Sequence, residues 1–213
     1  YMIFDYALCD IHSTLGSDIK ILVILRDPVK RLISQYRMRA SVGGERRSLD
    51  EAVSQQLDAG FDGFKNYVNR GLYYDQLQMV RKYFPRENIH ISVFEDFISD
   101  PEAGIKDVCR FLGIDESHAF DYDTKRNPGR NAKANFWGEL FYLVPRKLKY
   151  KFLNSMTPDK KKKFFAFISS KKKKLEPTEL SEKTMKRLQE LYRPQKKMLE
   201  EEYGLDLASW TSL

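Results

Sequence analysis

The sequence is poor in the residues that build disulfide or metal scaffolds. Its 213 residues include only two cysteines, Cys9 and Cys109, which lie far apart and have no metal-ligand spacing around them. A disulfide framework needs several paired cysteines, and a structural zinc site needs closely spaced Cys or His ligands. The sequence therefore excludes both, and we expect the two cysteines to be buried thiols.

Long apolar runs are also absent. No stretch approaches the roughly 18 apolar residues that a membrane span requires, and the N-terminus lacks the basic-then-apolar profile of a signal peptide. We therefore expect no membrane span in this chain. The sequence begins on Tyr1, within a segment whose pattern indicates ordered structure, so we expect that an upstream part precedes it.

The composition is that of an ordinary globular chain, with 42% hydrophobic and 31% charged residues. Its length suits one sizeable domain, which we expect to span residues 1–213. The net charge of +7 is uneven: residues 1–120 hold 15 Lys+Arg and 18 Asp+Glu, whereas residues 121–213 hold 22 and 12. The C-terminal part therefore carries a positive field that attracts anionic ligands, although a solvated surface that only aids solubility is the plainer interpretation.

A strand followed abruptly by a helix is predicted over residues 21–36. The apolar run Ile21–Leu25 shows no alternation and is rich in β-branched residues, which is typical of a strand buried on both faces of a parallel sheet. Asp27 is a suitable N-cap, and Pro28 suits the first helical position. The apolar stripe of the helix comprises Val29, Leu32, Ile33 and Tyr36.

Further elements alternate in the same way up to residue 113. Ser48 and Glu51 form a capping box for a short helix, and another helix begins near Gly71 and stops at Pro85. A second strand follows at residues 89–94, and a helix starts at Asp100-Pro101 and ends at Gly113. Strands separated by helices predict an α/β fold with a three-layer parallel sheet.

Beyond residue 121 the pattern changes to helices alone. The segments at 135–148, 160–170, 179–192 and 195–203 are helix-like and show no further strand signal, with Pro194 expected to break the last pair and Gly204 to end it. The stretch KKKKFFAFISSKKKK at 160–174 has an apolar centre between two lysine runs. It fits a helix lying on a membrane surface or a helix packed on the domain with solvated ends, and we expect the second.

An anion site is predicted where the first strand ends. Ligands of open parallel sheets bind beyond the carboxyl ends of the strands, and Arg26 stands there with a planar guanidinium suited to phosphate oxygens. Ser34, eight residues later, offers a hydroxyl two turns into the helix. In the alternative, Arg26 pairs with Asp27 or Glu95 and Ser34 is only a tolerated small residue.

These residues lie in segments that resemble the PAPS-dependent sulfotransferases, most closely their bacterial and carbohydrate-type branch. The segment KILVILRDPVKRLISQYRM is similar to the strand and helix with which that family binds the 3′-phosphate of its donor nucleotide. Later segments also match in order and spacing: RGLYYDQLQMVRKYFPRENIHISVFEDFISDPEAGIKDVCRFLGID, KRNPGRNAK and LYRPQKKMLEEEYGLDLASW. The resemblance covers about the whole chain and is weakest at 140–180.

The resemblance implies a P-loop-like α/β fold with a helical C-terminal portion. It implies transfer of a sulfuryl group from PAPS to a hydroxyl or amine of an acceptor, such as a glycan or another metabolite, without a metal. Arg26 and Ser34 would then hold the 3′-phosphate, and Gly129, Arg130 and Lys133 of the basic loop would cover it. The implied location is the bacterial cytoplasm, with a Golgi-lumenal domain behind a membrane anchor as the alternative.

Two parts of the family's machinery have no counterpart here. The Gly/Thr-rich 5′-phosphosulfate loop, with its lysine, precedes the 3′-phosphate strand in the family, and nothing in residues 1–20 resembles it. The family's general base also lies upstream, so we assign no catalytic residue. We expect the chain to be a sulfotransferase-like domain that lacks its N-terminal phosphosulfate-loop segment and is inactive by itself.

Two other functions compete with this interpretation. A nucleotide or small-molecule kinase of similar architecture would need the motif G-x-x-x-x-G-K-[ST], which none of the 11 glycines begins. A non-enzymatic binder of RNA or another polyanion would use the basic C-terminal part, but it should carry a known motif or interleaved aromatic and basic residues on one strand face. We expect no nucleic-acid partner.

Overall fold

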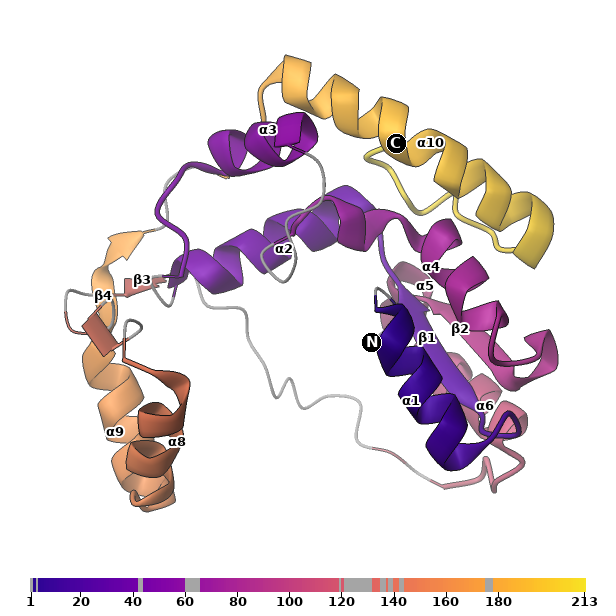
Figure 1. Ribbon diagram of the computed structural model, residues 1–213, viewed down its shortest axis with the longest axis horizontal. Helices are drawn as coiled ribbons and strands as arrows, with labels where there is room; N and C mark the ends of the chain where they lie inside the picture. The colour runs from indigo at the N-terminus through magenta and orange to yellow at the C-terminus, as the bar shows by residue number, and fades with distance from the viewer. Residues whose placement is uncertain are drawn as a thin grey trace. The chain divides into compact units, whose positions relative to one another are not determined.

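The computed structural model describes residues 2, 4–41, 44–59, 66–118, 120, 132–134, 137, 140–141, 144–174 and 178–213. The structure is mostly helical (Figure 1). Its elements, in chain order, are α1 (Asp5–Leu15), β1 (Ile21–Leu25), α2 (Pro28–Ser41), α3 (Leu49–Ala59), η2 (Asn69–Gly71), α4 (Tyr73–Arg81), η3 (Arg86–Asn88), β2 (Ile89–Val93), α5 (Phe94–Ser99), α6 (Pro101–Leu112), β3 (Ala132–Ala134), α8 (Arg146–Asn154), α9 (Pro158–Ile168), β4 (Ser169–Lys174) and α10 (Glu182–Tyr203).

The chain divides into two compact units. The first comprises Tyr1–Leu32, Phe61–Arg126 and Met185–Leu213, and the second comprises Ile33–Gly60 and Asn127–Thr184. Each unit is described by itself below. The single domain expected from the sequence stays a prediction.

The first unit contains the predicted parallel strand pair. β1 and β2 run parallel, with Ile21 opposite Ile89 and Leu25 opposite Val93. Parallel neighbours require a crossover, which the intervening helices supply. The first strand was predicted from its apolar run and the second from its alternating pattern, and Figure 1 shows them side by side. The α/β character expected from the sequence is confirmed in this small sheet and the helices around it.

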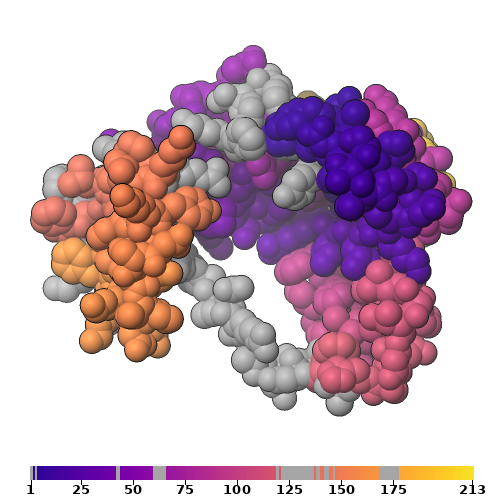
Figure 2. Space-filling model, turned by 60° about the horizontal axis from the view of Figure 1, so that its bottom comes forward, coloured from indigo at the N-terminus to yellow at the C-terminus, as the bar shows by residue number. Residues whose placement is uncertain are grey.

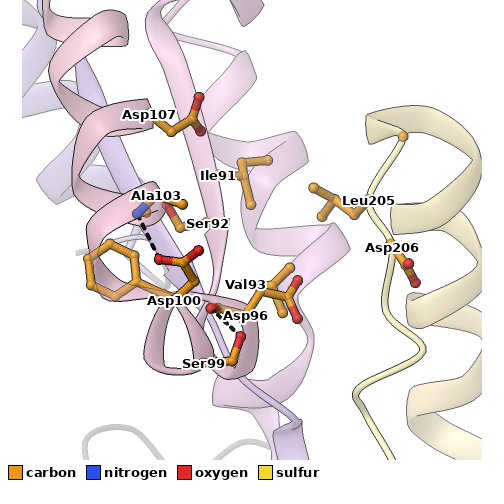
Figure 3. A pocket seen from close by; sticks show the side chains of 13 residues that line it. Ile91, Ser92, Val93, Asp96, Ser99, Asp100, Ala103, Asp107, Leu205 and Asp206 are labelled. Atoms are coloured by element: carbon orange, nitrogen blue, oxygen red, sulfur yellow. Dashed lines mark hydrogen bonds between the residues drawn. The ribbon is translucent and has the colours of Figure 1, made fainter. Parts of the chain in front are cut away.

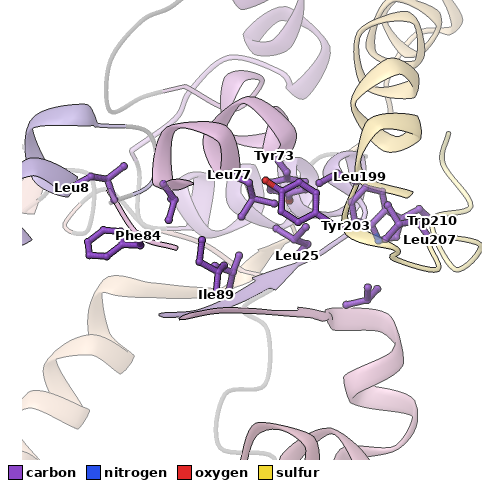
Figure 4. Close-up of a cluster of buried hydrophobic side chains, with 13 residues drawn as sticks. Leu8, Leu25, Tyr73, Leu77, Phe84, Ile89, Leu199, Tyr203, Leu207 and Trp210 are labelled. Carbon is purple, nitrogen blue, oxygen red and sulfur yellow. The ribbon is translucent and has the colours of Figure 1, made fainter. Parts of the chain in front are cut away.

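A hydrophobic core lies on one face of this strand pair. Figure 4 shows its side chains gathered between the strands, α4 and the C-terminal segment. Fully burying one such side chain contributes about 1.5 to 3 kcal/mol, so this cluster is the main source of stability in the unit. Its buried members are Leu8, Val23, Leu25, Tyr73, Leu77, Val80, Phe84, Ile89, Val93, Leu199, Tyr203, Leu207 and Trp210.

The exposure of the second face of β1 shows that one prediction was wrong. We expected the strand to be buried on both faces, but Leu22 and Ile24 are 46% and 57% exposed. On this face α6 reaches β2, where the Phe111 ring lies 5.1 Å from the His90 ring. The apolar run hides the difference between the two faces, because inward and outward residues of β1 are of the same type.

The last helix corrects a second prediction, because Pro194 lies inside α10 and does not break it. A proline in a helix interior removes one hydrogen bond and costs about 3 kcal/mol. The helix continues because one face of it is buried on both sides of the proline, at Leu188, Tyr192 and Leu199. The predicted end is confirmed: Gly204 adopts a left-handed conformation with φ of 66° directly after the helix.

Strands in the C-terminal part correct a third prediction. β3 and β4 pair antiparallel in the second unit, where only helices were expected. The predicted helix over 160–170 ends at Ile168, and the next six residues, SSKKKK, form β4. Serine and lysine have little intrinsic preference for strands, so their conformation follows from the pairing partner and not from their own pattern.

The predicted helix caps are confirmed. Ser48 and Glu51 exchange hydrogen bonds of 2.8 and 3.2 Å at the start of α3, which is the reciprocal pattern of a capping box. The Asp100 carboxylate accepts from the backbone N–H of Ala103 at 3.0 Å at the start of α6. Gly113 ends that helix in a left-handed conformation with φ of 72°.

The two cysteines differ in their surroundings. Cys109 is buried, as expected, but Cys9 is exposed, so the prediction for Cys9 was wrong. The reason is local, because α1 turns Leu8 toward the core and the next residue points to solvent.

Gly71 is expected to tolerate no side chain. A Cβ atom at this position would lie 2.8 Å from the Tyr192 ring and 2.9 Å from Cβ of Pro28, which is the first residue of α2. Because Tyr192 is buried, the ring has little freedom to move away. We expect Gly71→Ala to lower the free energy of unfolding by about 1 to 3 kcal/mol, as overpacking does elsewhere. Urea unfolding measures this change, and an unaltered midpoint would contradict the contact.

Candidate functional site

Arg26 lies at the carboxyl end of β1, as predicted. Its side chain is 33% exposed, and the guanidinium lies over the Phe94 ring, 4.7 Å from the centroid. The Nε atom is buried and makes no hydrogen bond, and the Arg26 side chain donates none to any other described residue. A guanidinium held over an aromatic ring, with hydrogen-bonding capacity to spare, is suited to an anionic ligand.

The alternative pairing of Arg26 with Glu95 is present in a weak form. Arg26 Nε and Glu95 Oε1 are 3.9 Å apart, which is close enough for charge attraction but too far for a hydrogen bond. Glu95 uses Oε1 to accept a hydrogen bond of 3.2 Å from the backbone N–H of Asp27, and its Oε2 is buried without a partner. Glu95 therefore orients the turn that carries Arg26, and it leaves the guanidinium hydrogen bonds of Arg26 unused.

Asp27 fixes the turn between β1 and α2. It is fully buried, and its Oδ1 caps α2 by accepting from Val29 and Lys30 at 3.0 and 3.1 Å. Its Oδ2 accepts from the backbone N–H of Ser212 at 3.1 Å, near the C-terminus of the chain. One carboxylate thus joins the helix start to a segment that is far away in the sequence. The predicted N-cap is confirmed, and its long-range role is new.

Tyr73 and Tyr192 lie behind this turn. Burial raises the pKa of the Tyr73 hydroxyl to about 12, and the nearby charge of Arg31 and polar groups of Arg31 and the Arg26 backbone oppose that rise. Burial also raises the pKa of Tyr192, whose hydroxyl donates to the Val68 carbonyl at 2.7 Å. Arg31 in turn donates to the carbonyl of Tyr67. The backbone of Arg26 is therefore held by buried polar groups, and only its side chain reaches the surface.

The structure describes the other predicted site residues to different extents. Ser34 is exposed on α2, eight residues after Arg26, so its hydroxyl is accessible. Gly129 and Arg130 lie outside the described residues. Lys133 is the middle residue of β3, where the backbone is described and the side chain is not.

Sequence reasoning named Glu95 as a possible partner of Arg26 but did not find the aromatic support that Phe94 gives it. Phe94 and Glu95 directly follow β2, and because β1 and β2 are parallel neighbours their carboxyl ends meet at one edge of the sheet. This adjacency is a usable signal, and it identified Glu95 as one alternative partner. Nothing in the local pattern of residues 70–75 or 207–213 indicates that Tyr73 and Ser212 reach the same turn.

A separate pocket of about 440 Å³ lies beside β2 and has the opposite charge. Figure 3 shows residues of β2, α5 and α6 facing Leu205 and Asp206 across it. Its lining includes four carboxylates, which would repel a phosphate. They belong to Asp96, Asp100, Asp107 and Asp206. Across the part of the chain that the structure describes, no group of three or more His, Cys, Asp or Glu could hold a metal ion.

Comparisons with known proteins show which family and fold this chain resembles. A family model described as the sulfotransferase domain matches residues 11–199. Heparan sulfate glucosamine 3-O-sulfotransferase 3B1 of Mus musculus is 30% identical over 121 residues, which cover 54% of this chain and 31% of that protein. The 3A1 enzyme of Homo sapiens is 29% identical over 121 residues, covering 54% of this chain and 30% of that protein. The chain thus spans less than a third of the length of these curated relatives.

A solved structure supports the fold. The crystal structure of a sulfotransferase from Alicyclobacillus acidocaldarius resembles this chain with a TM-score of 0.55 and 21% sequence identity. The match covers 99% of this chain and 64% of that one. In the described residues, no helix is both long and apolar enough to cross a membrane.

Proposed function

The chain belongs to the sulfotransferase domain family, and we propose that it binds the 3′-phosphate end of the donor PAPS through Arg26 and Ser34. The observation that carries this proposal is the guanidinium of Arg26. It stands at the carboxyl end of a parallel strand, over an aromatic ring, with no side-chain hydrogen bond to another described residue. That is the edge of the sheet at which open parallel sheets bind their ligands.

Side chains, and not the start of α2, would supply the attraction for the phosphate. Helix N-termini often bind anions through their free N–H groups, but the Asp27 carboxylate already occupies those of Val29 and Lys30. The negative charge of Asp27 also offsets the helix dipole. Arg26 would therefore provide the planar pair of donors, and the exposed Ser34 hydroxyl a third hydrogen bond.

The remainder of the donor site is proposed from the family resemblance. Gly129, Arg130 and Lys133 would cover the bound nucleotide from the basic loop. Sulfuryl transfer resembles phosphoryl transfer, in which positioning and charge stabilisation do most of the catalysis. Because no segment of this sequence resembles the 5′-phosphosulfate loop, we propose nucleotide binding without turnover for this chain by itself, and no metal.

The acceptor is proposed to be a hydroxyl or amine of a carbohydrate. The curated relatives named above act on heparan sulfate glucosamine, as their names state. The excess of ten positive charges in residues 121–213 suits an acidic glycan. This proposal extends only to the class of acceptor.

Two nucleotides that differ by one phosphate test the donor site. Adenosine 3′,5′-bisphosphate should bind more tightly than adenosine 5′-monophosphate in isothermal titration calorimetry. Arg26→Ala should weaken the bisphosphate about 30-fold, because a hydrogen-bonded charge pair contributes about 2 kcal/mol. The same variant should leave the affinity for the monophosphate unchanged. Ser34→Ala removes a neutral donor and should weaken the bisphosphate by about fivefold.

Arg110→Ala is the matched control, because Arg110 is an exposed arginine of α6 that lies in ion pairs with Asp107 and Glu116. It should bind both nucleotides like the unaltered chain. If Arg26→Ala weakened both nucleotides equally, Arg26 would not contact the 3′-phosphate. If the unaltered chain failed to distinguish the two nucleotides, the donor proposal itself would be wrong.

A further inference from the structure

The helical hairpin of α8 and α9 lies in the most strongly basic stretch of the C-terminal part. Residues 137–174, which include it, contain 12 Lys+Arg and only 2 Asp+Glu. Lys147, Lys151, Lys160, Lys162 and Lys163 are exposed. Such a concentration of cations needs an anionic partner or a large solvated surface.

An aromatic cluster holds the two helices of the hairpin together. The Phe152 ring of α8 and the Phe164 ring of α9 have centroids 5.4 Å apart, and both contact Phe141. Lys149 extends over the Phe141 ring at 5.8 Å, and desolvation lowers its pKa. Aromatic pairs of this kind contribute beyond their buried area. The hairpin therefore has a small aromatic core of its own, and its outward-facing residues are not part of that core.

Large apolar side chains nevertheless remain on the outside of the hairpin. Leu148 and Tyr150 of α8 are each 57% exposed, and Phe167 of α9 is 60% exposed. Trp137 and Leu140, just before the hairpin, are also exposed. Single exposed apolar residues are common, but a group of them in one short region marks a contact surface. The hairpin is drawn in orange in Figure 2, in which its surface faces the viewer.

Cations and apolar groups share the same helix surfaces. On α8, the exposed Leu148 lies directly after Lys147 and three residues before Lys151, whereas Phe152 packs into the aromatic cluster. On α9, Lys160 and Lys163 lie seven and four residues before Phe167, so all three fall on one side of the helix. A helix that combines lysines with exposed leucine and aromatic residues is typical of the interface between water and a lipid bilayer.

We propose that the α8–α9 hairpin docks on the surface of an anionic lipid bilayer. The lysines would contact the headgroups, and Leu148 and Phe167 would enter the boundary of the acyl chains. A bilayer explains both features, because a polysaccharide or RNA would pair with the cations and leave the leucine without an apolar environment. Tyrosine and tryptophan side chains also favour this boundary. The proposal is independent of the donor site and involves no membrane span.

Vesicle binding by the whole chain tests the proposal. The chain should co-sediment with phosphatidylcholine vesicles that contain about 30% phosphatidylserine, and much less with pure phosphatidylcholine, because the anionic surface attracts basic side chains. Binding should fall as the salt concentration rises above about 0.1 M, where the Debye length is about 10 Å. Equal binding to both kinds of vesicle, or none to either, would overturn the proposal.

Two double variants test separately how charge and apolar contact contribute to vesicle binding. Lys147→Glu with Lys151→Glu should weaken partitioning at least about 20-fold, since each basic side chain near the membrane contributes about fivefold. Leu148→Ser with Phe167→Ser should also weaken it, while heparin and RNA binding stay unchanged. The matched control is Ile98→Ser with Ile114→Ser, because both residues are as exposed as Leu148 but lie outside the hairpin. This control should bind vesicles normally.

Trp137 offers a second measurement that does not depend on the stability of those variants. The chain has two tryptophans, of which Trp137 is exposed and Trp210 is buried. The fluorescence of Trp137 should shift to the blue on addition of anionic vesicles, and Trp137→Phe should abolish the shift. If instead the chain bound heparin or RNA but not vesicles, and the serine variants bound those polyanions normally, the hairpin would be a polyanion site and the lipid proposal would be wrong.

Discussion

Replacing Asp27 by alanine is expected to lower the free energy of unfolding by about 3 to 4 kcal/mol. Loss of an N-cap costs about 1 kcal/mol, and a buried donor left without its acceptor costs about 1 to 3 kcal/mol. Asp27→Ala does both, because the carboxylate caps α2 and also accepts from Ser212. The change also leaves a small cavity at a fully buried position. Urea unfolding monitored by circular dichroism measures the loss.

Asp100→Ala is the matched control for this prediction. Asp100 also precedes a proline and caps a helix, α6, but it is exposed, and among the described residues its carboxylate makes only the cap bond to Ala103. Its replacement should therefore cost only the cap, about 1 kcal/mol. The difference between the two variants measures the contribution of the bond to Ser212 and of burial. Equal losses in both would mean that the long-range bond of Asp27 contributes nothing.

The sequence predicts the starts and ends of elements because these depend on residues a few positions apart. The caps at Asp27, Ser48 and Asp100 and the left-handed glycine after α6 were all expected from such local chemistry. The first strand was expected from its uninterrupted apolar run and the second from its alternation of apolar and polar residues. Their parallel arrangement was expected from the helices between them. Each of these features requires only the physics of one turn or one strand.

The sequence cannot predict features that depend on distant partners. Leu22 and Ile24 resemble their neighbours in β1, and only the position of α6 over β2 leaves them exposed. Pro194 stays inside α10 because residues on both sides of it are buried by other elements. The strand β4 consists of serine and lysine, so its conformation is set by its pairing with β3. In each case tertiary contact overrides local preference.

The candidate site likewise combines features that the local sequence predicts with features that depend on distant residues. The position of Arg26 at a strand end, and the exposed hydroxyl of Ser34, follow from the strand–helix pattern. The setting of Arg26 does not, because Phe94 and Tyr73 come from other elements. The guanidinium lies over the Phe94 ring, and its Nε is 3.9 Å from the carboxylate of Glu95. Glu95 would repel a bound phosphate. Its role in the structure is to accept the hydrogen bond from the backbone N–H of Asp27.

Raising the pH above 10 is expected to destabilise the chain through Tyr73. Burial raises the pKa of this hydroxyl from its ordinary value of 10 to about 12. The folded state therefore holds the proton more tightly than the unfolded state, and stability is complete below pH 10 and lost as the pH rises toward 12. A pKa difference of two units corresponds to about 2.7 kcal/mol, of which about 2.3 kcal/mol is lost by pH 12. The pKa of Tyr192 is raised by burial in the same direction and adds to the loss.

Tyr73→Phe tests this dependence because phenylalanine fills the same space and does not ionise. At pH 8 the variant should be about 1 kcal/mol less stable, since it loses the polar interactions of the buried hydroxyl with Arg31 and the Arg26 backbone. Between pH 10 and 12 its stability should fall less steeply than that of the unaltered chain, so the two curves converge. Tyr6→Phe, at an exposed position, is the control and should reproduce the unaltered curve. Parallel curves for Tyr73→Phe and the unaltered chain would show that Tyr73 ionises equally well in both states, and the turn behind Arg26 would then be open to water.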